Sequence, residues 1–265
     1  TRKESSAASD VYKRQVLITL TESGSADTDA TPGVVLVAAK ISDGTNALAS
    51  DQPVFNGASN AAPPAISATE TLDSDKDGQI DQILVTLSEA IADGSSTLNN
   101  TTFTVAGYTV SNTTTGTSAN DNKVLISLAE SGSADTDATP NVILVAAKIS
   151  DGANALASDQ TFTGTADTAP PAIIEAKTLD DDKDGQIDQI LVTLSETITD
   201  GSSTLDNTTF TVAGYTVSNT TTGTSANDNK VLITLTESGS ADTDATPNVE
   251  LCLLYTSDAA DDSLR

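Results

Sequence analysis

Short runs of alternating apolar and polar residues, separated by turn-rich segments, fill most of the chain. In the stretch 80–91 (IDQILVTLSEAI), Ile83, Val85 and Leu87 fall on one face of an extended backbone. The stretch 123–130 (KVLISLAE) alternates in the same way. A period of two residues is typical of a β-strand with one buried face. The pattern therefore predicts strands at both places.

Three other segments complete the expected secondary structure. Residues 102–110 (TFTVAGYTV) place Phe103 and Val105 on one face of a strand, with Tyr108 on the other. Residues 142–149 (VILVAAKI) form a nearly continuous apolar run, which predicts a strand buried on both sides or at the centre of a sheet. No stretch shows a convincing helical period, although 153–158 could form one short turn. Several short strands with frequent turns favour an all-β fold built from antiparallel β-sandwiches.

The chain repeats itself at the scale of a domain. Val16, Val124 and Val231 begin the stretches VLITLTESGSADTDATP, VLISLAESGSADTDATP and VLITLTESGSADTDATP, at spacings of 124 − 16 = 108 and 231 − 124 = 107 residues. Such a period indicates a tandem array of modules. Proline pairs at 63–64 and 170–171 suit the boundaries between them. We therefore expect the late part of one repeat at 16–61, a complete repeat at 62–168 and the early part of another at 169–251.

The two ends differ from the repeat. SSAASDVYKRQ (5–15) and CLLYTSDAADD (252–262) resemble translated adaptor sequences from sequencing libraries, and they can be back-translated into near-perfect reverse complements of one another. We therefore expect 1–15 and 252–265 to be adaptor-like artefacts around a metagenomic fragment, and we exclude them from the fold. The single cysteine, Cys252, lies in the second of these segments.

Composition narrows the function. The chain has 38 acidic and 12 basic residues, a formal net charge of −26 and no histidine. This acidity argues against nucleic acid and anionic membranes as partners, because both attract Lys and Arg. No apolar run is long enough to predict membrane insertion in this fragment. Without histidine, Ser–His and Cys–His catalysis are absent, and every acidic constellation is copied once per repeat, so we expect no enzyme.

One acidic loop recurs in two repeats, as LDSDKDGQID (72–81) and LDDDKDGQID (179–188). Alternate residues in a tight loop can turn their carboxylates onto one hard cation, glycine at the sixth position permits the sharp turn, and the carbonyl of the seventh residue can add an oxygen. The sequence therefore predicts Ca²⁺ bound by Asp73, Asp75, Asp77, Gln79, Asp81, Asp180, Asp182, Asp184, Gln186 and Asp188.

The sequence leaves the identity of the ion and its remaining ligand undecided. The alternative is a solvated Asp-rich turn, and Mg²⁺ fits less well because its tight octahedron seldom uses so many carboxylates. A further oxygen ligand must come from water or from elsewhere, with Glu89 and Glu196 as weak candidates. A second acidic segment, Asp135-Thr136-Asp137, is too sparse to form a site alone and is interpreted as an Asp-capped turn.

The order of motifs carries a family resemblance. APPAI, then LDxDxDGxIDxIxVTLSExI, then TFTVAGYTV, then KISDGANALAS resembles the immunoglobulin-like repeats of large secreted and surface proteins of bacteria. Leu87 and Leu194 depart from it, because many relatives carry Phe there. The resemblance implies an extracellular or cell-surface location and neighbouring repeats of the same chain as partners.

Three kinds of function remain for such an array. The leading hypothesis is a structural extender of an adhesin-type protein, stiffened by calcium. The alternatives are a module that binds a carbohydrate or protein ligand, and an accessory linker of a secreted multidomain enzyme. Carbohydrate sites usually present exposed aromatic rings, and Tyr108 and Tyr215 are the tyrosines within the repeats.

Overall fold

A computed structural model describes residues 16–252, apart from 23, 43–46, 48, 56–58, 131, 200–202, 224 and 238. The described chain is all-β, with thirteen strands, one 3₁₀ turn at Asp93–Ser95 and no α-helix. The adaptor-like segments lie outside it except for Cys252. None of the described residues forms a helix that is long and apolar enough to cross a membrane.

The second repeat (62–168) consists of two antiparallel sheets around one core. Its strands are β1 (Ile66–Leu72), β2 (Gln82–Leu87), β3 (Phe103–Val105), β4 (Thr109–Thr115), β5 (Lys123–Ala129), β6 (Val142–Leu144) and β7 (Gln160–Phe162). One sheet has the order β1-β2-β5-β4 and the other the order β3-β6-β7. All neighbouring strands are antiparallel.

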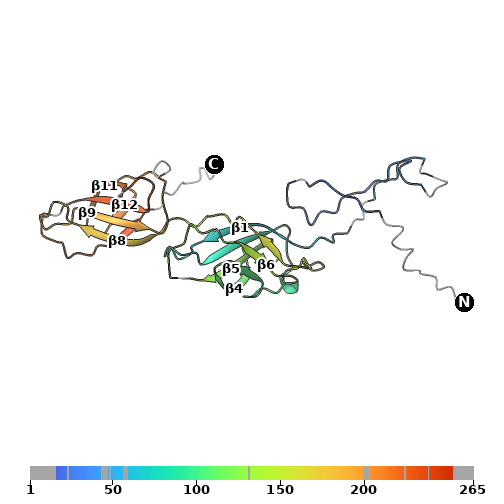
Figure 1. The fold of residues 1–265 in the computed structure, drawn as a ribbon, viewed down its shortest axis with the longest axis horizontal. Helices are drawn as coiled ribbons and strands as arrows, with labels where there is room; N and C mark the ends of the chain where they lie inside the picture. Colours follow the sequence, from blue (N-terminus) through green and yellow to red (C-terminus); the bar gives the residue numbers. More distant parts are fainter. Residues whose placement is uncertain are drawn as a thin grey trace, which may run out of the picture.

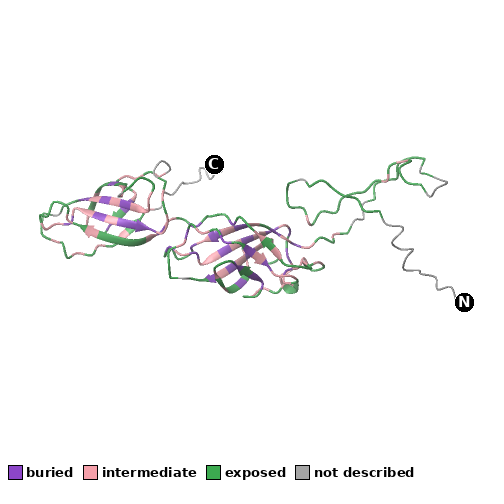
Figure 2. Cartoon of the chain, in the orientation of Figure 1, coloured by how far each residue is buried: buried purple, intermediate pink, exposed green. Residues whose placement is uncertain are grey.

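The core lies between these two sheets, as the alternation predicts. Ile83 and Val85 are fully buried from the first sheet, and Phe103 and Leu144 are at most 1% exposed from the second. All four belong to one apolar cluster. Figure 2 shows this alternation as buried bands across the strands, with exposed residues concentrated in the loops.

The third repeat (169–251) reproduces most of this arrangement. Its strands are β8 (Ile173–Leu179), β9 (Gln189–Leu194), β10 (Phe210–Val212), β11 (Thr216–Thr222), β12 (Lys230–Thr236) and β13 (Val249–Leu251). They form a four-stranded sheet, β8-β9-β12-β11, and a two-stranded sheet, β10-β13. Ile190, Val192 and Phe210 lie in its core.

The first repeat (16–61) contains only isolated bridges among its described residues, such as that between Val34 and Phe55. Leu17 is 93% exposed and Phe55 is 64% exposed. The second and third repeats lie end to end along the long axis of the molecule, and the first repeat lies beyond the opposite end of the second (Figure 1).

Two local expectations were wrong. Residues 102–110 are not one strand, because the backbone turns at Gly107 (φ of 85°) between β3 and β4. The apolar run 142–149 is a strand only as far as Leu144, and the backbone then turns at Ala147, which has a φ of 59°. Asp159 stabilises this turn by accepting a hydrogen bond from the Ala146 amide (2.8 Å). The segment 153–158 forms no helical turn, because Asp151 accepts hydrogen bonds from the Ala153 and Asn154 amides and holds the segment as a loop.

Candidate metal centre

The first acidic loop (73–81) joins β1 to β2 and is shaped by its own carboxylates. Asp73 accepts hydrogen bonds from the amides of Lys76 (2.6 Å) and Gly78 (2.9 Å), which folds the loop around its side chain. Lys76 and Gly78 have φ values of 64° and 94°. Glycine adopts such a conformation without the steric cost that a Cβ brings, which explains its place at the sixth position.

The carboxylates of this loop converge in two overlapping groups. Oxygen atoms of Asp73, Asp75 and Asp77 lie within 4.8 Å of one another, and so do oxygen atoms of Asp75, Asp81 and Glu130. Asp75 belongs to both groups. Oxygen-rich clusters of this kind have the chemistry that Ca²⁺ prefers.

The second acidic loop (180–188) has the same geometry. Its two groups are Asp180 with Asp182 and Asp184, and Asp182 with Asp188 and Glu237. The Asp180 carboxylate accepts hydrogen bonds from the amides of Lys183 (2.7 Å) and Gly185 (3.0 Å). The predicted aspartates are therefore brought together in both loops.

The predicted carbonyl ligands, Gln79 and Gln186, remain a prediction. The Gln79 amide donates to Asp77 Oδ1 (2.9 Å), and its side-chain Nε2 donates to Asp77 Oδ2 (2.8 Å). Gln186 makes the same two contacts with Asp184 (2.9 and 2.7 Å). These glutamines orient the third aspartate of each loop.

Glu130 and Glu237 were missed by sequence reasoning, which named Glu89 and Glu196 as weak candidates for the further oxygen. Neither of those belongs to the carboxylate groups of the described residues. Glu89 instead accepts a hydrogen bond from Asn60 Nδ2 (3.2 Å). Glu130 follows directly after β5, and the antiparallel pairing of Gln82 with Ser127 brings that end of β5 to the acidic loop.

Negative charge accumulates around the fifth carboxylate. The pKa of Glu130 is raised, foremost by the charge of Asp77, then by burial and by the other three aspartates of the loop. The pKa of Glu237 is raised in the same way, foremost by Asp184. A divalent cation would compensate this repulsion, so the donor set fits Ca²⁺ chemically.

The second acidic segment holds the loop in place. Asp135 accepts hydrogen bonds from the Ile80 amide (2.8 Å) and from the Tyr108 hydroxyl (2.8 Å), and its own amide donates to the Gly78 carbonyl (3.0 Å). In the third repeat, Asp242 makes the equivalent contacts with Ile187, Tyr215 and Gly185. Asp135 thus fixes the acidic loop against the strands. The interpretation as an Asp-capped turn is not supported, because the Ala138 amide closes this turn on the Asp135 carbonyl (2.9 Å), while the carboxylate binds Ile80 and Tyr108.

No family model, curated protein or solved structure matches the chain. The interpretation of the site therefore depends on its geometry and on the repeated sequence.

Proposed function

We propose that the chain consists of structural extender repeats of a large bacterial cell-surface or secreted protein of the adhesin type, and that Ca²⁺ binds the acidic loops and stiffens the array. The observation that carries this proposal is the recurrence of one module with one carboxylate cluster. Asp75, Asp81 and Glu130 in the second repeat have exact counterparts in the third. Such copying fits a role set by length and rigidity, because no single module then needs its own binding surface.

The strand order supports the immunoglobulin-like part of the proposal. Sheets β1-β2-β5-β4 and β3-β6-β7 correspond to the ABED and CFG sheets of a constant-type immunoglobulin domain. The end-to-end arrangement of the second and third repeats agrees with an extended array (Figure 1).

The environment of Tyr108 favours the extender over a carbohydrate-binding module. Its ring packs against the core, and its hydroxyl donates to Asp135. The half-buried ring therefore contributes to packing within the module, whereas carbohydrate-binding sites present an aromatic face to solvent.

Thermal unfolding in calcium and in chelator tests the proposed role of the ion. Calcium at about 100 times its Kd stabilises a folded site by about 2.7 kcal/mol, so the melting temperature should rise. The double variant Asp75→Asn/Asp182→Asn should lose most of this rise.

Glu22→Gln is the matched control, because Glu22 occupies the position of Glu130 in the first repeat, and no acidic loop precedes it in this sequence. It removes one negative charge and should leave the calcium response intact. A wild-type melting temperature that ignores millimolar calcium would contradict the proposal and leave the solvated turn.

A further inference from the structure

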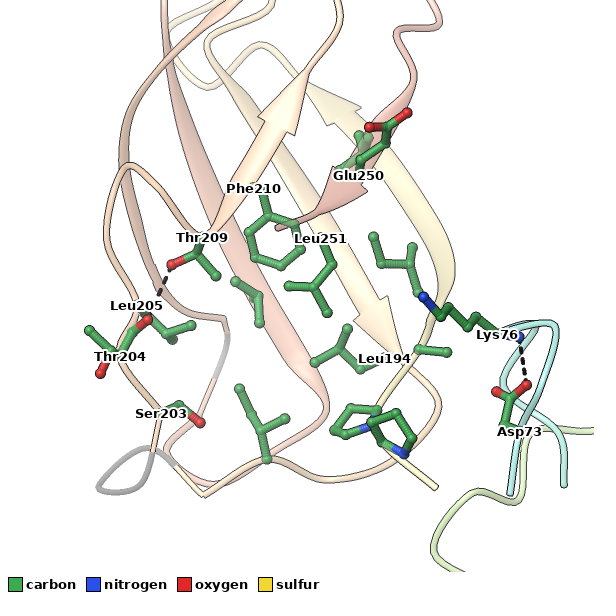
Figure 3. Close-up of a pocket in the computed structure, with 17 residues that line it drawn as sticks. Asp73, Lys76, Leu194, Ser203, Thr204, Leu205, Thr209, Phe210, Glu250 and Leu251 are labelled. Carbon is green, nitrogen blue, oxygen red and sulfur yellow. Dashed lines mark hydrogen bonds between the residues drawn. The ribbon is translucent and has the colours of Figure 1, made fainter. Parts of the chain in front are cut away.

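The first acidic loop lies against the third repeat. A Cβ added at Gly78 would approach Ile174 Cγ2 to 2.6 Å and Ser195 Cβ to 3.1 Å, so the backbone of the loop directly contacts the next module. Asp73 and Lys76 of the same loop border a cavity of about 570 Å³ in the third repeat, beside Leu194 (Figure 3). The loop is thus part of the joint between two modules.

A second contact connects the loop with this joint. Thr136 is fully buried, and its Oγ1 lies 2.7 Å from Ser195 Oγ. The preceding residue, Asp135, binds the Ile80 amide and the Gly78 carbonyl. Two adjacent residues therefore hold the acidic loop on one side and the next module on the other.

The same joint occurs between the first and second repeats. Thr28 Oγ1 lies 2.6 Å from Ser88 Oγ, and Ser88 exchanges hydrogen bonds with Ala65. Ser195 and Ala172 make the equivalent pair at the next joint. Because the contact recurs one repeat later, it is a property of the module.

The two acidic loops differ in what covers them. Asp73 is 8% exposed and Thr136 is fully buried at the joint. Their counterparts in the third repeat are more open, since Asp180 is half-buried and Thr243 is exposed. Around Gly185, a Cβ would meet only Ala241, at 3.8 Å. Two loops of nearly identical sequence thus differ in the presence of a docked module and of the segment around Ala166, which lies beside β1 in the second repeat.

We propose that docking of the following module and binding of a divalent cation to the acidic loop are cooperative, so that the first loop binds Ca²⁺ more tightly than the second. This inference depends on the proposed calcium function of the loops. A docked module already restricts the loop around Gly78, so less conformational entropy remains to be lost when the ion binds. By reciprocity, the ion strengthens the joint by the same factor.

Site-resolved calcium titration of the full chain tests the inference. In nuclear magnetic resonance, the amides of Gly78 and Gly185 report on the two loops separately. Coupling between sites is commonly about fivefold or more, so the Kd of the first loop should be at least about fivefold lower. Calorimetric titration of Asp182→Asn and Asp75→Asn, which each leave one loop intact, should give the same order.

Weakening the joint between the second and third repeats should abolish the difference in calcium Kd between the two loops. Thr136→Val with Ile174→Ala removes the hydroxyl contact and the packing on Gly78, and should bring the Kd of the first loop to that of the second. Thr243→Val is the control for the Thr136→Val part of this variant, because none of the described residues docks a further module on Thr243. It should change neither Kd.

The outcomes separate this inference from the proposed function. Equal affinities at both loops, or a first-loop affinity that ignores the loosened joint, would overturn the coupling while leaving calcium binding intact. A complete absence of calcium binding at both loops would overturn both proposals.

Discussion

Aspartates that are neighbours in space have different roles in this molecule. Asp75 and Asp81 belong to the carboxylate cluster, whereas Asp135 lies outside it and accepts hydrogen bonds from Ile80 and Tyr108. Burial and the hydrogen bond to Asp135 raise the pKa of Tyr108, so its phenol stays a protonated donor at neutral pH. The Tyr–Asp pair therefore belongs to the support of the loop.

Replacing Tyr108 by Phe tests this support. The change removes the hydroxyl and leaves one oxygen of Asp135 without its partner, and a hydrogen bond to a charged group contributes about 1.5–3 kcal/mol. Urea unfolding should show the loss in the second repeat. Tyr215→Phe should act in the same way on the third, and an unchanged unfolding free energy in both variants would argue against a supporting role.

Replacing Glu130 by Gln tests the fifth carboxylate. The variant keeps the size of the side chain but removes its charge, so calcium should bind the first loop more weakly, by about tenfold for a loss of about 1.4 kcal/mol. Titration calorimetry measures this. Glu22→Gln should have no effect, and an equal response in the two variants would exclude Glu130 as a ligand.

At the scale of the element, the equivalent strands β1 and β8 differ in whether another segment pairs with their outer edge. In the second repeat the segment after β7 runs beside β1, where the Thr71 amide donates to the Ala166 carbonyl (3.0 Å) and the Ala166 amide donates to Thr69 (2.8 Å). In the described part of the third repeat no such segment lies beside β8, and Leu179 is 36% exposed.

Hydrogen exchange should distinguish these two strands. The amide of Thr71 is hydrogen-bonded across the edge of its sheet, so it should exchange slowly. The amide of Thr178, at the equivalent position of β8, should exchange much faster in the same sample. Equal protection of the two amides would contradict the open edge of β8.

At the scale of the whole molecule, negative charge recurs along the array. Each acidic loop gathers five carboxylates, and the pKa values of Glu130 and Glu237 are raised above the ordinary value of 4.5. A raised pKa means that the folded protein binds this proton more tightly than the unfolded chain does. The stabilisation is therefore present below pH 4.5 and is lost as the pH rises through the raised pKa.

Thermal melts in chelator from pH 4 to 7 test whether this contribution to stability falls as the pH rises. Asp121, Asp151 and Asp206 have lowered pKa values and act in the opposite direction, so the comparison must be between variants. Glu130→Gln/Glu237→Gln should lose less stability than the wild type as the pH rises. With calcium bound, the variant and the wild type should lose similar stability as the pH rises. A larger loss in the variant in chelator would contradict a raised pKa for these glutamates.

The sequence by itself determined the alternating strands, the repeat and the aspartates of the two acidic loops. Ile83, Val85 and Phe103 are buried as the alternation predicts. The aspartates of each loop are brought together because the D-x-D-x-D-G spacing acts within nine residues. Short-range spacing of this kind acts through backbone geometry, which the sequence reveals directly.

Only the tertiary structure decided which distant residues join the loop. Glu130 reaches Asp75 through the pairing of β2 with β5, and Thr136 reaches Ser195 through the packing of two modules. The run 142–149 was also misread, because its turn depends on Asp159. Such contacts are set by strand register and by docking across many residues, whereas apolar periodicity records only which face of a segment is buried.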